Sequence, residues 1–136
     1  MRYKAKAYFK PEHRTNPILL TTADDVDHLL AALTAESWQN SVASIYLDDR
    51  VTRTGVPDHE LQVVVDYTDK TTGALRYTDR DGTYFTKGVT SGGDSVLYYY
   101  MGNDVEYPRD SVVPIEDLRT AVKKFLESGE RPTHHA

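Results

Sequence analysis

Residues 110–132 read DSVVPIEDLRTAVKKFLESGERP, and this stretch marks both ends of an amphipathic helix. Pro114 suits the first helical position, because its φ is fixed and it has no amide hydrogen to leave unpaired. Gly129 suits the C-terminal cap, and Pro132 prevents the helix from continuing. Apolar side chains recur between them at helical spacing: Ile115, Leu118, Val122 and Phe125. The stretch predicts a helix with one apolar face, which must pack against another element.

A second amphipathic helix is predicted in the first half of the chain. Thr22 can cap its first turn, and Asp25 stands three residues on, as in a capping box. The apolar residues that follow are spaced i, i+3, i+4 and i+7: Val26, Leu29, Leu30 and Leu33. This helix therefore also has one face to bury.

Strands are predicted over most of the remaining chain. Residues 3–9 and 60–67 alternate apolar and polar side chains, as a half-buried strand does. Further strands are expected at 18–20, 42–47, 74–78, 83–87, 96–101 and 104–107. Short turns join most of them, including Gly102-Asn103 as a two-residue type II′ loop, and short turns favour antiparallel pairing.

The expected fold is therefore α+β. It has a largely antiparallel, twisted sheet of about six strands, with the two helices packed on one face. Residues 1–132 are expected to form a single domain, because a chain of 136 residues can bury a core of its own. Residues 133–136 are expected to be a disordered tail.

Composition narrows the possible functions. The chain contains no cysteine, which excludes disulfides, thiolate zinc sites and cysteine nucleophiles. It has 21 acidic and 16 basic residues, a net charge of −5, and this disfavours direct binding of nucleic acid. The acidic balance suits a basic protein partner, although it also serves simply to keep a small domain in solution. No secretory signal and no apolar run of roughly 20 residues is present, so a cytoplasmic protein without membrane contact is expected.

Catalytic and metal-binding motifs are not found in the sequence. The glycine-rich segment 88–93 lacks the Gly-Lys-Ser/Thr ending of a phosphate loop. The His-x-Glu and Pro-Cys-x-x-Cys signature of zinc deaminases is absent. Asp79-Arg-Asp81-Gly82 is better explained as a tight turn than as the start of a calcium loop, which needs more oxygen ligands. We expect no catalytic residues, no metal and no cofactor.

Three consecutive tyrosines, Tyr98, Tyr99 and Tyr100, lie on one predicted strand. Neighbours on a strand face opposite sides, so Tyr98 and Tyr100 share one face while Tyr99 lies on the other with Leu97 and Met101. One set is expected to enter the core beneath the helices. The other is either an interface, where tyrosine is favoured, or an ordinary sheet face with cross-strand aromatic pairs.

The second half of the chain resembles a family of bacterial immunity proteins. The resemblance covers residues 61–132 and rests on the aromatic segments 84–88 (YFTKG) and 97–100 (LYYY), and on the closing helix with GERP at 129–132. This family, numbered first among the immunity families, comprises small proteins encoded beside polymorphic toxins, often toxins with nucleic-acid deaminase domains. Its members often continue to an apolar residue and a tryptophan, whereas this chain ends with THHA at 133–136.

The resemblance implies a protein that binds a cognate toxin domain and occludes its active site. The toxin it implies is a deaminase that targets nucleic acid. Acids and aromatics of the second half are the candidate partner-binding residues: Asp79, Asp81, Tyr84, Tyr99, Asp104 and Glu106. The alternative is a small-ligand-binding domain or an enzyme with a tyrosine-lined pocket between sheet and helix. The sequence leaves open whether the protein is a monomer or a homodimer.

Overall fold

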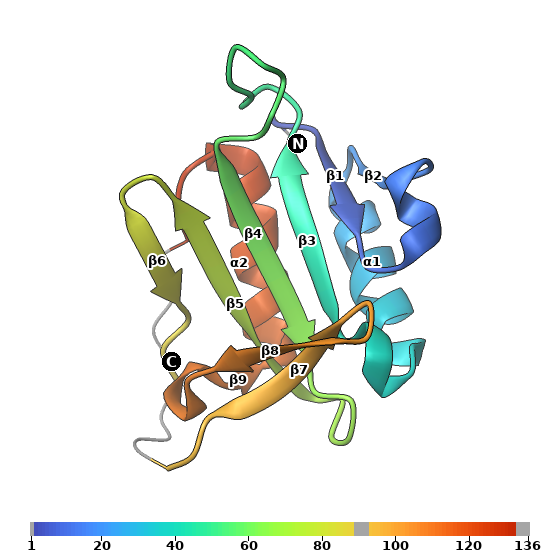
Figure 1. Cartoon of the computed structure of the whole chain (residues 1–136), viewed down its shortest axis with the longest axis vertical. Coiled ribbons are helices and arrows are strands. Elements are labelled where there is room, and N and C mark those ends of the chain that lie inside the picture. The colour runs from blue at the N-terminus through green and yellow to red at the C-terminus, as the bar shows by residue number, and fades with distance from the viewer. Residues whose placement is uncertain (1, 89–92, 133–136) are drawn as a thin grey trace.

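The computed structural model describes residues 2–88 and 93–132 (Figure 1). This part of the chain has two α-helices. Helix α1 (Ala23–Ala35) comes between the second and third strands, and α2 (Ile115–Ser128) follows the last strand. The strands are β1 (Ala5–Tyr8), β2 (Ile18–Leu20), β3 (Val42–Leu47), β4 (His59–Val65), β5 (Thr72–Asp79), β6 (Gly82–Phe85), β7 (Val96–Tyr100), β8 (Asn103–Tyr107) and β9 (Val113–Pro114). Short 3-10 helices lie at Pro11–Arg14, Trp38–Asn40 and Arg109–Ser111.

The main sheet is antiparallel throughout and has the strand order β2-β1-β3-β4-β5-β6. The short β9 also pairs with β5, through Thr72 and Gly73. Along β4, Leu61, Val63 and Val65 belong to the core on one side of the sheet, whereas Val64 belongs to a second cluster on the other side. Both faces of the sheet are therefore covered at this end of β4, which explains why Val63, Val64 and Val65 are consecutive apolar residues.

Both helices cover the same face of the sheet, as predicted (Figure 1). Thr22 caps α1, and Asp25 returns the hydrogen bond to complete the capping box. Helix α2 begins at Ile115, one residue later than expected, because Pro114 still pairs with Thr72. It ends at Ser128 and is capped by Gly129, whose φ of 69° is left-handed. The α+β class and the placement of the helices are confirmed.

The hairpin of β7 and β8 forms a third layer on the face of the sheet that the helices leave uncovered (Figure 1). Its inner side buries Tyr98 and Tyr107 against Val42, Val64 and Ala74. The alternation predicted for the tyrosines is confirmed, but their expected place beneath the helices is wrong. Tyr98 fills a separate small core, because the hairpin pairs with no strand of the main sheet and packs across its opposite face.

The turn of this hairpin also differs from the prediction. Its central residues are Met101 and Gly102, with φ values of 50° and 85°, and Asn103 already pairs with Tyr100. Positive φ at both central positions is the mark of a type I′ turn, not of the expected type II′ turn at Gly102-Asn103.

The expected tail at residues 133–136 lies outside the described residues. Within residues 2–88 and 93–132, no helix has the length and apolar character needed to cross a membrane.

Candidate functional site

Exposed aromatic side chains gather beside the outer face of the β7–β8 hairpin. The ring of Tyr99 lies 4.7 Å from that of Trp38 and 5.9 Å from that of Tyr67, measured between centroids. Trp38 is 48% exposed and Tyr67 is 37% exposed. We call these three residues the aromatic platform. Leu97, exposed on the same side of β7 as Tyr99, extends the apolar surface along the strand.

Backbone hydrogen bonds hold the platform in place. The amide of Ser41 donates to the carbonyl oxygen of Tyr99 (3.0 Å), and the amide of Tyr99 donates to Ser41 Oγ (2.9 Å). The amide of Gly102 donates to the carbonyl oxygen of Gln39 (2.9 Å). These bonds fix β7 to the segment that carries Trp38, so the aromatic rings are positioned before any partner arrives.

Two carboxylates stand on the same outer face of the hairpin. Asp104 lies opposite Tyr99 in the β7–β8 ladder, and Glu106 lies opposite Leu97. Opposed residues of an antiparallel pair point to the same side. Both carboxylates are exposed. Of the predicted partner-binding residues, the structure thus brings Tyr99, Asp104 and Glu106 together on one surface.

The other predicted residues lie elsewhere. Asp79 and Asp81 occupy the β5–β6 turn, where Asp79 Oδ1 accepts the amide of Asp81 at 2.8 Å. Tyr84 lies opposite Tyr77, whose ring packs on Phe125 of α2, so Tyr84 is on the helix side of the sheet. The guanidinium of Arg131 sits 3.8 Å above the Tyr84 ring. Tyr84 therefore does not share a surface with Tyr99.

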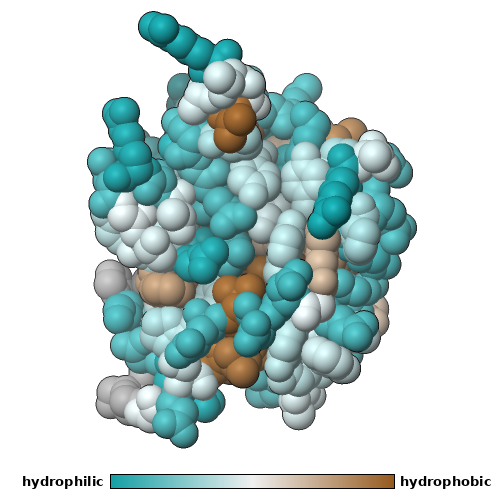
Figure 2. All heavy atoms as spheres, in the orientation of Figure 1, coloured by the Kyte–Doolittle hydropathy of each residue, from teal (hydrophilic) through white to brown (hydrophobic). Residues whose placement is uncertain are grey.

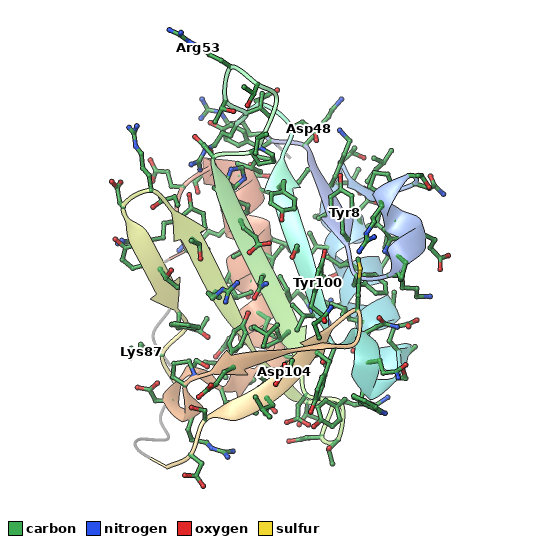
Figure 3. The ribbon with its side chains drawn as sticks, viewed as in Figure 1. Tyr8, Asp48, Arg53, Lys87, Tyr100 and Asp104 are labelled. Atoms are coloured by element: carbon green, nitrogen blue, oxygen red, sulfur yellow. The ribbon has the colours of Figure 1, made fainter. Side chains whose placement is uncertain are left out.

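A hollow of about 720 Å³ opens on the same sheet face as the hairpin. Its floor is formed by polar side chains of four neighbouring strands, among them Tyr8, Tyr46, Glu60 and Thr78, and the loop 48–58 overhangs it. Figure 3 shows Tyr8 and Asp48 on this side of the sheet, with Arg53 pointing away at the loop tip. In Figure 2, brown atoms lie at the loop and in the lower half beside the hairpin, and mostly teal and white atoms lie between them.

Hydrogen bonds and ion pairs order the floor of the hollow. The Tyr46 hydroxyl donates to Glu60 Oε2 at 2.7 Å, and Arg76 Nη2 approaches Glu60 Oε1 at 3.4 Å. Lys6 Nζ lies 3.3 Å from Asp48 Oδ1. Burial and the neighbouring Glu60 carboxylate together raise the pKa of Tyr46. Tyr46 is thus held as a neutral hydrogen-bond donor.

The sequence interpretation missed this hollow. It placed a possible pocket between sheet and helices, but that space is filled by the main core. The available signal was the polar face of the strands: Lys6 and Tyr8 in β1, Tyr46 in β3, Glu60 in β4, Arg76 and Thr78 in β5. That pattern shows which face is polar, but not that a hairpin covers only part of it.

The described residues offer little for catalysis by a metal. No group of three His, Asp or Glu side chains among them is arranged to hold an ion. The two buried histidines are engaged in the backbone: His13 Nδ1 accepts the amides of Phe9 and Lys10, and His59 Nε2 accepts the amide of Leu47.

Comparison with curated proteins gives no match. The family model described as "Immunity protein Imm1" matches residues 14–135, which extends well beyond the segment 61–132 that carried the resemblance. The match includes both helices and every strand from β2 to β9, and leaves out only β1. The chain belongs to the Imm1 family of immunity proteins.

Proposed function

We propose that this immunity protein binds the toxin domain encoded beside it and neutralises it by covering its active site. The toxin acts on nucleic acid, and a deaminase domain is the class that the family resemblance implies. The protein itself needs no catalytic group for this role. Its contribution is a preformed surface, and a specific interface needs about 800 Å² of such surface from each partner.

The aromatic platform is the observation that carries this proposal. Trp38, Tyr67 and Leu97 are exposed around the half-buried Tyr99, and contiguous apolar surface of this kind is typical of interaction sites. Tyrosine and tryptophan also dominate the energetics of protein interfaces, because they bury a large area while keeping a polar tip. The hydrogen bonds between Ser41 and Tyr99 hold the backbone of β7 against the segment that carries Trp38, so this part of the surface is ordered before binding and less entropy is lost.

Exposed acids support a basic partner. Asp104 and Glu106 stand on the outer face of the hairpin beside the platform, and Asp79 and Asp81 lie apart from it at the β5–β6 turn. A toxin that binds nucleic acid carries cationic side chains around its active site, because it must neutralise phosphates. The carboxylates of an acidic face can pair with the same cationic side chains of the toxin.

Binding of a small ligand is the second candidate, and the hollow is the observation that favours it. Its volume of about 720 Å³ falls in the range of ligand pockets, roughly 300–1,000 Å³. Ligand sites are mostly lined by apolar side chains, whereas charged and tyrosine side chains line the floor here. We therefore place this candidate second.

The test pairs the purified protein with the toxin domain of the adjacent gene in a binding titration, and with rescue of cells that express that toxin. Tyr99→Ala should weaken binding by about 30-fold or more if Tyr99 is a hot spot of about 2 kcal/mol. Tyr84→Ala is the matched control, because Tyr84 is an equally large strand residue on the helix side of the sheet. A wild-type protein that neither binds nor rescues would refute the immunity mechanism proposed here.

A further inference from the structure

We propose that the hollow receives a basic loop of the bound toxin and holds one of its arginine or lysine side chains. This inference rests on the proposed function and adds a second anchor to the same interface. The cationic side chain of the toxin would bind here, outside the aromatic platform.

The wall of the hollow is formed before binding. The loop 48–58 folds back on itself: Val51 pairs with Pro57, and the amide of Thr52 donates to the carbonyl oxygen of Val56 at 2.7 Å. The amide of Gly55 donates to the carbonyl oxygen of Thr52 at 2.9 Å. A loop with its own internal hydrogen bonds keeps its shape better than one held at its ends alone. The loop 48–58 is therefore ordered before a partner binds.

The same loop is anchored to the body of the protein by Arg50. Its Nη1 donates to the Tyr77 hydroxyl (2.9 Å) and to the carbonyl oxygen of Gly129 (3.2 Å), and its Nη2 lies 3.2 Å from Asp58 Oδ1. These contacts connect the loop to β5 and to the end of α2. An incoming side chain therefore enters an existing cavity, which lowers the ordering cost of binding.

The charge of the lining favours a cation. Four carboxylates line the hollow (Asp48, Asp58, Glu60 and Asp79) against two cations (Lys6 and Arg76). Both cations already have partners, since Lys6 is paired with Asp48 and Arg76 with Glu60. Asp79 forms no ion pair with a lysine or arginine within the described part of the chain. Arg50 stands outside the lining, and the carboxylates of Asp58 and Asp79 both act to raise its pKa. Three cations thus face four carboxylates, and one added positive charge would balance them.

The uncharged lining fits the rest of a long basic side chain. The rings of Tyr8 and Tyr46 meet edge to face at 5.9 Å and offer π-faces to a guanidinium or an ammonium. Val51 and Val56, 49% and 58% exposed, can pack against the methylene groups of its stem. The carboxylates would repel an anion, and a wholly apolar ligand would make no use of their negative charge.

The hollow and the hairpin are neighbours. Tyr100 of β7 lies on the hairpin's inner side, where burial and the charge of Glu60 both act to raise its pKa. Tyr100 and Tyr8 lie on the same side of the sheet in Figure 3. One partner can therefore contact the outer hairpin face and place a loop in the hollow.

A bulky cation placed in the hollow tests the proposal. Thr78 lines it, and Thr83 lies directly opposite Thr78 in the ladder, on the same face but outside the lining. We expect Thr78→Arg to weaken binding of the adjacent gene's toxin domain by about 30-fold or more, as loss of a central anchor does. Thr83→Arg, which adds the same charge and bulk one strand away, should bind within a few-fold of wild type.

A second variant removes charge without adding bulk and remains informative if Thr78→Arg does not fold. The double variant Glu60→Gln and Asp79→Asn keeps acceptor oxygens for Tyr46 and for the amide of Asp81. It should dissociate from the toxin faster than wild type while its thermal melting point stays close to that of wild type. Toxin affinity equal to wild type in both variants would overturn the inference and leave the hollow to a small ligand. Absence of binding by the wild-type protein would instead refute the proposed function itself.

Discussion

His59 determines how the loop above the hollow is attached to β4. Its side chain is buried, and Nε2 accepts the amide of Leu47 at 2.9 Å. The proton of the neutral ring must then be on Nδ1, which donates to Asp58 Oδ1 at 2.9 Å. Burial lowers the pKa of His59 below its usual 6.5, and the hydrogen bond to Asp58 only partly offsets this. The folded protein therefore holds the ring neutral.

Acidification should destabilise the protein through this residue. Because the folded state binds a proton at His59 less readily than the unfolded state, stability is fully present above the unfolded pKa of 6.5 and falls as pH drops towards the folded pKa. His13, whose pKa burial also lowers, contributes with the same sign. Urea denaturation at about pH 7.5 and about pH 5.5 should show lower stability in acid.

The variant His59→Gln separates this effect from general acid sensitivity. It should be less stable than wild type at the higher pH, because it disturbs the bonds to Leu47 and Asp58. Its stability should change less between the two pH values, because one titrating group is gone. An equal loss in both proteins would mean that His59 does not carry the pH dependence.

Little of this residue-level detail could be predicted from the sequence. The alternation of Tyr98, Tyr99 and Tyr100 was predictable, because neighbours on a strand always face opposite sides. The role of His59 was not, since its partner Leu47 is twelve residues away and on another strand. The separation of Tyr84 from Tyr99 was not predictable, because the side on which Tyr84 lies depends on the β5–β6 register, which composition does not reveal.

At the scale of elements, helix α2 was the most predictable part. Its stop signal and apolar stripe are local, and Leu118, Val122 and Phe125 are all fully buried. The β7–β8 hairpin was predictable as a pair of strands, because the two strands are joined by a two-residue turn. Its packing across the sheet was not predictable, because it depends on contacts of Tyr98 and Tyr107 with strands that lie far away in sequence.

Truncating the centre of the α2 stripe tests the main core. Phe125 has no exposed surface and packs against both Tyr77 and His59. Phe125→Ala should lower the free energy of unfolding by about 3–5 kcal/mol, because it leaves a cavity between helix and sheet. Lys124→Ala, at the exposed neighbouring position, should change it by less than about 0.5 kcal/mol. Equal melting temperatures for the two variants would contradict this account of the core.

At the scale of the whole molecule, the layers explain how one side of the protein can serve as a binding surface. The helices bury one face of the sheet, and the hairpin buries only part of the other. The α+β class followed from the sequence, because each helix has a single apolar stripe that must cover a sheet face. The placement of both helices on one face was also predicted, and the shared core confirms it. The hollow was not predicted, because it exists only where a distant hairpin stops and the loop 48–58 overhangs.

The net charge of −5 should raise the rate at which the protein associates with the toxin. Long-range attraction between an acidic protein and a basic toxin raises the association rate, and salt screens it over about 8 Å at physiological ionic strength. Neutralising Asp104 and Glu106, which are exposed on the outer face of the hairpin, should therefore mainly slow association and reduce its dependence on salt. Tyr99→Ala should instead speed dissociation, because it removes a short-range contact.

Association and dissociation rates measured at two salt concentrations distinguish these two effects. If the acids act by steering, the rate difference between wild type and the Asp104→Asn, Glu106→Gln variant should shrink as salt is added, because screening removes the long-range term from both proteins. A salt-independent difference would mean that these carboxylates make direct contacts in the complex. If the toxin binds tightly but neither rate responds to the acids or to Tyr99, it binds another face, and the aromatic platform is not the anchor.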